Sequence, residues 1–300
     1  MDDAVALAAG AARVAIAPRT GGAIASFTFD GQDVLRPAPA GTRDVRAHAG
    51  WPLVPYSNRI AHARFEFAGR AHVLARNFGD HPHSIHGVGW QRPWAVAARA
   101  ATRARLVFDH SPDGDGARAW PWAFRATQLL ALRSDAAGAA LTITLTIANT
   151  GSEAFPFGLG FHPFFVRTAA TRLAFRAAGV WATDATMLPT TLKPALREGP
   201  FDAGRDPGPT TIDNAFAGWE GVATLRDEGR RLGVTVAADR AASFLVVYAP
   251  GGGECIALEP ATQMTDAFNR AARGEQDTGT RTLRPGGAFS CTMEIAVHRS

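Results

Sequence analysis

A single histidine stands in the aromatic segment FPFGLGFHPFF, which runs from Phe155 to Phe165. Alternate residues of a strand point to opposite faces, so this segment, taken as one strand, has an apolar face and a nearly bare one. Glycines beside an imidazole make room for a ligand against the backbone; a satisfied core histidine near a β-bulge is the alternative. The apolar face carries Phe155, Phe157, Leu159 and Phe161, and the other carries Pro156, Gly158, Gly160 and His162.

A carboxylate occupies a similar position in the segment ECIALEP. Cys255, Ala257 and Glu259 share one face at the end of an expected strand, while Ile256 and Leu258 pack behind it. A glutamate in an apolar run is either paired with an arginine or held for proton transfer, with its pKa tuned by partial desolvation. The residues alone leave both roles open.

Three histidines cluster in the segment GDHPHSIHGVGW, at positions His81, His83 and His86. A mononuclear metal site needs about three ligands and usually a carboxylate behind them. The turn residues Pro82 and Gly87 favour a loop at the mouth of a site instead. We therefore expect no metal, and the contribution of His81 and His83 stays open.

Three further polar residues could bind a ligand. Asn58 and Arg59 stand in the segment PLVPYSNRIAHARF, where they could equally be surface turn residues. Asp213 stands in TTIDNAFAGWEG, where an Asx turn or a helix cap is the local alternative.

Strand patterns dominate the segments that must position these residues. LTITLTIAN (141–149) alternates apolar and threonine side chains, which predicts a half-buried strand. Asp30-Gly31 and Gly69 mark short turns between strands. The segment 231–260 predicts three strands, and the middle one is apolar on both faces and therefore central.

Helical patterns are sparse, and the segment 262–274 alone predicts a short helix, with apolar residues at helical spacing and a closing glycine. Many short strands separated by 31 glycines and 19 prolines predict an antiparallel β-sandwich or barrel. We find no linker, low-complexity tract or repeat, so the sequence predicts one domain over residues 1–300.

The composition argues against several classes of function. The 31 Lys and Arg exceed the 27 Asp and Glu by only four and form no basic run, so no nucleic-acid partner is expected. No apolar run approaches the ~18 residues of a membrane span. Two cysteines without CxxC spacing indicate buried thiols in a reducing compartment. The opening MDD lacks the positive charge of a secretory signal, and we expect a cytoplasmic protein.

The segments described above occur together in an order that resembles the aldose 1-epimerase (galactose mutarotase) family. The resemblance extends from GGAIASF to GGAFSCTMEI and is carried by SNRI, IHG, GLGFHPFF, IDNAF and ALEP. It implies an all-β fold, a single antiparallel β-supersandwich with few short helices, and a sugar-binding cleft on a concave face.

The resemblance also implies roles for five residues. Glu259 of ALEP matches the general base of the family, and His162 of GFHPFF matches the general acid. His86 of IHG matches a second catalytic histidine. Arg59 of SNRI, next to Asn58, matches a substrate-binding arginine, and Asp213 of IDNAF matches an aspartate that holds sugar hydroxyls.

The implied activity is mutarotation, in which acid and base catalysis opens an aldose at the C1–O5 bond and recloses it as the other anomer. It needs no cofactor, and the partner is a small sugar. VPYSNRI and EPATQMTDAFN depart from the commoner family patterns and suit a divergent bacterial-type branch, so the particular aldose stays open. The oligomeric state is not indicated.

Two other functions remain as alternatives. A non-catalytic carbohydrate-binding protein could use the same cleft, although binding has no need of a proton-transfer pair. A glycosidase is disfavoured because hydrolysis usually needs two opposed carboxylates. An epimerase of a phosphorylated hexose would need basic residues at the cleft rim, with Arg64, Arg70 and Arg76 as possible contributors.

Overall fold

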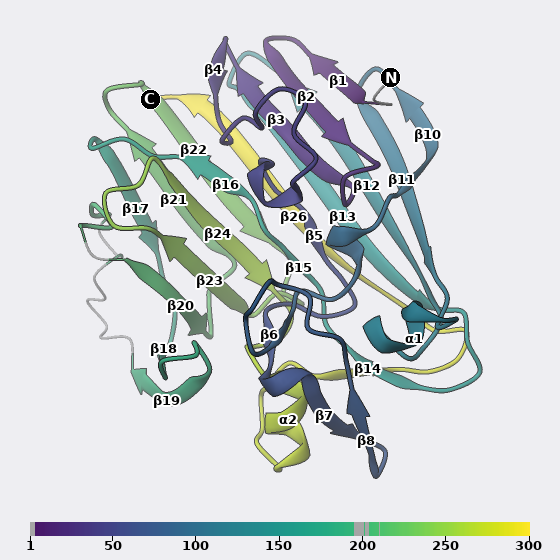
Figure 1. The fold of residues 1–300 in the computed structure, drawn as a ribbon. Helices are drawn as coiled ribbons and strands as arrows, with labels where there is room; N and C mark the ends of the chain where they lie inside the picture. Colours follow the sequence, from purple (N-terminus) through teal and green to yellow (C-terminus); the bar gives the residue numbers. More distant parts are fainter. Residues whose placement is uncertain (1–3, 195–200, 202–203, 210) are drawn as a thin grey trace.

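A long antiparallel sheet runs across the whole molecule (Figure 1). The computed structural model describes residues 4–194, 201, 204–209 and 211–300. The strand that comes last in the sequence, β26, lies between β13 and β22 in the middle of this sheet. In spatial order the sheet contains β10 (Ala95–Ala100), β11 (Arg103–His110), β12 (Phe124–Ser134), β13 (Ala139–Asn149), β26 (Ala288–Arg299), β22 (Leu232–Ala238), β21 (Val222–Asp227) and β17 (Thr171–Phe175).

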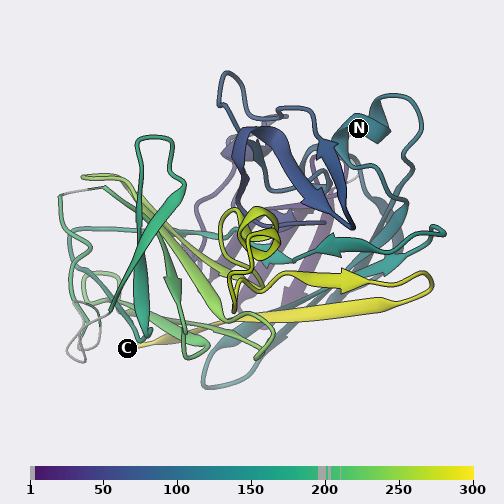
Figure 2. The same ribbon diagram turned by 90° about the horizontal axis from the view of Figure 1, so that it is seen from below.

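Two further sheets lie over the two ends of the long sheet (Figures 1 and 2). The four-stranded one, over the end with β11 and β12, contains β1 (Val5–Ala9), β2 (Ala12–Ala17), β3 (Ala23–Phe29) and β4 (Gln32–Asp33). The other is eight-stranded and contains β19 (Pro189–Pro194), β18 (Gly179–Thr183), β20 (Ile212–Ala217), β23 (Phe244–Ala249), β24 (Cys255–Ala261), β15 (Gly160–Phe161) and β5 (Pro52–Leu53), with β16 (Phe164–Val166) also on β24.

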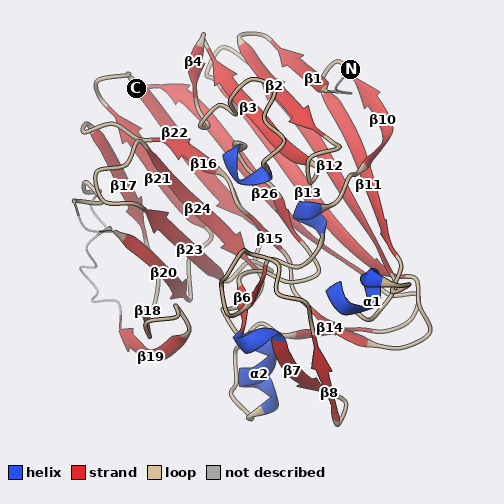
Figure 3. Cartoon of the chain, in the orientation of Figure 1, coloured by secondary structure: helices blue, strands red, loops and turns tan. Residues whose placement is uncertain are grey.

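The remaining elements are short (Figure 3). Three two-stranded ladders pair β6 (Arg59–Ile60) with β9 (Ser84–Ile85), β7 (Arg64–Phe67) with β8 (Arg70–Val73), and β14 (Phe155–Phe157) with β25 (Arg281–Leu283). The α-helices are α1 (Asp115–Ala119) and α2 (Ala267–Ala272), and the 3-10 turns are η1 (Val45–Ala47), η2 (Ala61–Ala63) and η3 (Gly89–Gln91). No helix in the described part of the chain has the length and apolar character that a membrane span requires.

The sheets share one main hydrophobic core. Its buried side chains include Leu7 of β1, Leu141 of β13, Val236 of β22 and Leu258 of β24, so both covering sheets pack on the long one. This arrangement confirms the expected all-β antiparallel sandwich. That residues 1–300 form a single domain stays a prediction, which the shared core supports. Asp2 and Asp3, part of the expectation of a cytoplasmic protein, lie outside the described residues.

The periodic segments fold as predicted. Along β13 buried and half-buried residues alternate. Asp30 and Gly31 both have positive φ values and form the turn between β3 and β4. β22, β23 and β24 are the three expected strands, and β23 is central, between β20 and β24. The predicted helix is present as α2, which begins only at Ala267 because Asp266 is in the left-handed region.

The aromatic segment corrects the prediction of one continuous strand. It is divided into β14, β15 and β16, and these strands have different partners: β14 pairs with β25, whereas β15 and β16 pair with β24. Its apolar side chains do enter the core, as expected.

The glycines of this segment do not make room for a ligand. A Cβ at Gly158 would overlap the side chain of Gln263, and one at Gly160 would lie 3.0 Å from Leu53 and 3.1 Å from Ser57 Oγ. The space beside these glycines is therefore filled by protein atoms, and their role is close packing. The cysteines need a smaller correction: Cys291 is buried, but Cys255 is only half-buried, and both are free.

Candidate active site

The site lies on the outer face of the sheet that contains β20, β23 and β24. Ile256 and Leu258 of β24 point into the main core, so Glu259 on the same strand points the other way. β23 lies next to β24, and β20 lies next to β23. Asp213 of β20 pairs with Tyr248 of β23. This register sets Asp213 on one side of Glu259.

His162 lies on the other side of Glu259. It follows β15, whose Gly160 pairs with Ala261 of β24, and it precedes β16, whose Phe164 pairs with Ala257. The break between β15 and β16 therefore brings an imidazole beside a carboxylate that is about 100 positions later in the chain. The sequence indicated that Glu259 ends its strand. In the structure Glu259 lies inside β24, which continues to Ala261.

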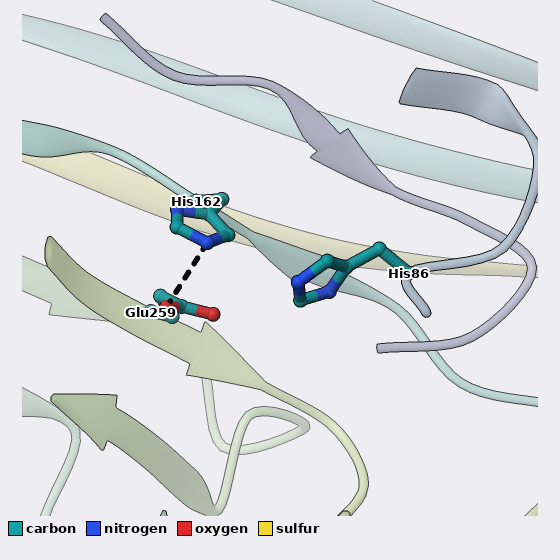
Figure 4. Close-up of side chains that lie close together, drawn as sticks. All are labelled: His86, His162 and Glu259. Atoms are coloured by element: carbon teal, nitrogen blue, oxygen red, sulfur yellow. Dashed lines mark ion pairs between the residues drawn. The ribbon is translucent and has the colours of Figure 1, made fainter. Parts of the chain in front are cut away.

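Nε2 of His162 is 3.2 Å from Oε1 of Glu259 (Figure 4). Both residues are buried, with 8% of His162 and 3% of Glu259 exposed. The second carboxyl oxygen, Oε2, is buried without a hydrogen-bond partner among the described residues. A buried carboxyl oxygen normally has a partner, so Oε2 is available to a ligand.

Burial shifts the proton affinities of this pair in opposite directions. It raises the pKa of the Glu259 carboxyl well above 4.5, and the charge of Asp213 acts in the same direction. It lowers the pKa of the His162 imidazole, which the charges of Arg36 and Arg59 lower further. Both shifts favour the uncharged form of each residue. Because Nε2 and Oε1 are in contact, a proton on this pair can pass directly from one partner to the other.

Two aromatic rings hold the imidazole of His162 in place. The ring of Trp51 stacks on it with centroids 4.5 Å apart, and the ring of Phe164 stacks on it with centroids 4.8 Å apart. Sequence reasoning missed both residues in this role. Phe164 belongs to the quoted aromatic segment, but nothing in the spacing of Trp51 sets it apart from core tryptophans.

His86 faces the pair from a separate loop (Figure 4). Its ring centroid is 5.2 Å from that of His162, and the rings are nearly perpendicular. Its Nδ1 accepts a hydrogen bond from the backbone N–H of Asn58 at 3.1 Å. Burial lowers the pKa of His86 well below 6.5, and the charges of His162 and Arg59 contribute.

Arg59 and Asp213 form an ion pair, with Nη2 and Oδ2 3.4 Å apart. Oδ1 of Asn58 accepts hydrogen bonds from the backbone N–H of Arg59 at 2.9 Å and from its Nη1 at 3.0 Å. Asn58 thus positions Arg59 through its side-chain oxygen, which is then no longer free to accept from a ligand. Burial raises the pKa of Asp213, whereas the nearby Arg59 opposes this shift.

These side chains line one cavity of about 280 Å³. This is close to the lower end of the ~300–1,000 Å³ of small-molecule sites, which suits a single small ligand. All six predicted site residues line it, namely Asn58, Arg59, His86, His162, Asp213 and Glu259. Its other walls are Arg46, Trp51, Phe78, His81, Ile85, Phe164, Val246 and Tyr248.

Two of the three clustered histidines line the cavity. His86 and His81 line the cavity, but His83 does not; it is buried and its Nδ1 accepts from the backbone N–H of His62 at 3.0 Å. The arginines considered for the cleft rim, Arg64, Arg70 and Arg76, are also absent from the lining of this cavity. The basic residue at its edge is Arg46, which the sequence did not indicate.

One group of side chains could hold a metal ion within the described ranges. Its members are His86, His162 and Glu259, whose ligand atoms lie within 4.8 Å of one another. Nδ1 of His86 is already occupied, so only its Nε2 is open to a metal. The same atoms suit proton transfer, and the absence of a metal stays a prediction.

The family model described as Aldose 1-epimerase matches residues 3–296. The Escherichia coli (strain K12) protein YphB, which is described as uncharacterized, is 29% identical over 285 residues, covering 92% of this chain and 93% of YphB.

Two solved structures show the same fold. A galactose mutarotase-like protein from Clostridium acetobutylicum has a TM-score of 0.85 at 19% identity, covering 99% of this chain and 95% of that one. The GalM/aldose epimerase homologue from C. elegans has a TM-score of 0.82 at 17% identity, covering 100% and 99%.

Proposed function

The chain belongs to the aldose 1-epimerase family, and we propose that it is a mutarotase that interconverts the α and β anomers of an aldose. The observation that carries this proposal is the buried pair of Glu259 and His162, 3.2 Å apart. The pair can share one proton inside a cavity large enough for a single small ligand, and one carboxyl oxygen has no hydrogen-bond partner among the described residues. A site that only bound sugar would not require a proton-transfer pair.

In the proposed ring-opening step, Oε2 of Glu259 accepts the proton of the C1 hydroxyl while Nε2 of His162 gives its proton to the ring oxygen O5. The C1–O5 bond breaks, its electron pair stays on O5, and C1 becomes an aldehyde carbon. Rotation about C1–C2 presents the other carbonyl face. The reverse transfers then close the ring as the other anomer, so protons balance over the cycle.

The two proton states of the pair match the two halves of this reaction. Ring opening requires a protonated His162 and an ionised Glu259, and ring closure requires the neutral form of each. Because Nε2 and Oε1 are 3.2 Å apart, one proton moved between them interconverts these states without exchange with solvent. Burial favours the neutral form, so the ion pair is the more reactive state.

The other residues of the cavity have positioning roles in this proposal. Arg59 and Asp213 lie together on the far side of Glu259 and offer donors and acceptors to sugar hydroxyls. His86 presents Nε2 to the ligand from its own loop, within 4.8 Å of the ligand atoms of the pair. Such groups hold the sugar so that C1 and O5 meet the base and the acid.

The proposal is tested with Glu259→Gln, which keeps the size and one hydrogen-bonding oxygen but removes the base. Anomer exchange, measured by saturation-transfer NMR of the anomeric protons, should fall by ~10²- to 10⁴-fold. Sugar binding, titrated on the same preparation, should persist. Glu66→Gln removes a carboxylate from an exposed position of β7 and is the matched control. Exchange close to that of the unmodified protein would reject the catalytic role and favour a non-catalytic sugar-binding protein.

A further inference from the structure

A second cavity opens beside the proposed active site. It has a volume of about 670 Å³ and shares two of its lining residues, Arg46 and Phe78, with the cavity that contains Glu259. The two cavities therefore meet at these side chains. A group attached to the bound sugar could reach from one into the other.

The second cavity is strongly basic. Its charged lining residues are Arg19, Arg43, Arg46 and Asp44. Asp44 accepts from Nε and Nη2 of Arg46 at 3.0 and 2.9 Å, so it offsets one of the three guanidinium charges. Arg19 and Arg43 form no ion pair with any residue in the described part of the chain. The lining thus carries a net charge of about +2. Nη1 of Arg46 donates to no residue in the described part of the chain, so this arginine can still bind an anion while Asp44 holds its other side.

A row of aromatic rings joins the acid His162 to this basic cavity. Trp51 stacks on His162, the ring centroid of Trp90 is 6.2 Å from that of Trp51, and that of Phe78 is 6.0 Å from that of Trp90. The guanidinium of Arg46 lies 5.6 Å from the Phe78 ring centroid. The row therefore connects the acid to the arginines.

The order of groups along the site gives the bound sugar a direction. In a pyranose ring C1 is flanked by O5 on one side and C2 on the other. If O5 faces His162 and O1 faces Glu259, then C2 and C3 lie toward Arg59 and Asp213. C5 follows O5, so the substituent on C5 extends past His162 toward Phe78 and Arg46.

We propose that the substrate is an aldose with a negatively charged group at C6, and that Arg46 and Arg43 bind this group in the basic cavity. This inference rests on the proposed mutarotase function. Guanidinium groups bind phosphate and carboxylate oxygens in fixed, often two-pronged geometry. A phosphate on O6 reaches further than a C6 carboxylate, so a 6-phosphate engages both arginines and a uronate engages Arg46 alone.

The test compares free hexoses, their 6-phosphates and glucuronate by saturation-transfer NMR at one ionic strength. We expect kcat/KM for the preferred 6-phosphate to exceed that of the same free hexose by at least about tenfold, the effect of one charge-assisted hydrogen bond. The double variant Arg43→Gln, Arg46→Gln should reduce this ratio to near one. Arg105→Gln removes the same kind of charge from an exposed position of β11, outside both cavities, and should leave the ratio unchanged.

Competition gives a second readout. Inorganic phosphate should raise the KM for a 6-phosphate in the unmodified protein and have about tenfold less effect in the double variant. Two results would overturn this inference and leave the mutarotase proposal standing. One is equal kcat/KM for free hexoses and their 6-phosphates, and the other is a preference for the 6-phosphate that persists in the double variant. Exchange of no sugar in the panel would instead overturn the mutarotase proposal, and the inference with it.

Discussion

Asn58 and His86 hold each other through two hydrogen bonds. The backbone N–H of Asn58 donates to Nδ1 of His86 at 3.1 Å, and the backbone N–H of His86 donates to the carbonyl of Asn58 at 2.9 Å. Both residues have φ in the left-handed region, 60° and 63°. Because Nδ1 accepts, the neutral ring carries its proton on Nε2. His86 therefore meets the ligand as a hydrogen-bond donor.

This geometry predicts opposite defects for two substitutions of His86. Asn places an oxygen near the position of Nδ1 and tolerates positive φ, so His86→Asn should stay stable but lose the donor and about a hundredfold of kcat. His86→Gln should keep a donor near Nε2 and retain more activity. It leaves the N–H of Asn58 without a partner, which costs about 1–3 kcal/mol of unfolding free energy.

Urea unfolding and anomeric exchange, measured on the same two variants, check this prediction. The order of the two variants is the informative result: His86→Asn should be the more stable, and His86→Gln should be the more active. If His86→Asn is the more active variant, the donor role of Nε2 is wrong.

The pH profile should reflect the pair of His162 and Glu259 and not either residue alone. The active form carries one proton, and an ordinary pair would gain its second proton near pH 4.5. Here burial lowers the pKa of His162 to about 3 and raises that of Glu259 above 4.5. The pair therefore gains its second proton only near pH 3. It loses its single proton at a pH above 4.5.

We expect a bell-shaped profile in which kcat/KM is maintained below pH 4.5 and falls only toward about pH 3. Near-UV circular dichroism at each pH shows whether the protein is still folded. An acid limb with its midpoint at or above pH 4.5 in folded protein would contradict the burial-driven shift.

The close packing at Gly158 predicts a loss of stability and not of ligand binding. A Cβ there would overlap the Gln263 side chain, so Gly158→Ala should lower the unfolding free energy by about 1–3 kcal/mol. Activity per folded molecule should be retained. Gly151→Ala places its Cβ at ordinary contact distances, the nearest 3.6 Å, and should change stability by no more than about 0.5 kcal/mol.

A second substitution tests the cause of this effect. Gln263→Ala shortens the side chain that fills the space. The double variant Gly158→Ala, Gln263→Ala should therefore lose less unfolding free energy than the sum of the two single losses. Strictly additive losses would show that Gly158 is required for another reason.

Removal of metal ions should leave the exchange rate unchanged. Nε2 of His162 and Oε1 of Glu259 already contact each other, and His86 has only Nε2 open, so proton transfer alone can supply the reaction. Dialysis against a strong chelator, followed by the NMR exchange assay, makes the comparison. Activity that is lost and then restored by one divalent ion would identify His86, His162 and Glu259 as its ligands.

The sequence predicts the strands well where its period is regular. The alternation in β13 and the Asp30–Gly31 turn need only local information, because neighbouring residues determine the face and the turn. The aromatic segment is different. Its division into β14, β15 and β16 depends on partners far along the chain, β25 and β24, which no local period encodes.

The same distinction applies to the candidate site. The resemblance indicates five of the polar residues that line the cavity, and Asn58 is a candidate from its own segment. Their order along the sheet requires the strand pairing. Trp51 and Arg46 were not indicated, because stacking on His162 and proximity to a second cavity are properties of the folded chain. The occupied space beside Gly158 and Gly160 is another such property.

The central position of β26 has a consequence for biosynthesis. Until residues 288–299 leave the ribosome, β13 and β22 lack their common neighbour and each exposes an unpaired edge. Unpaired edges recruit other strands and promote aggregation. The nascent chain thus depends on the late arrival of one strand to join the two halves of its largest sheet, and chaperone binding during translation should concentrate on those two edges.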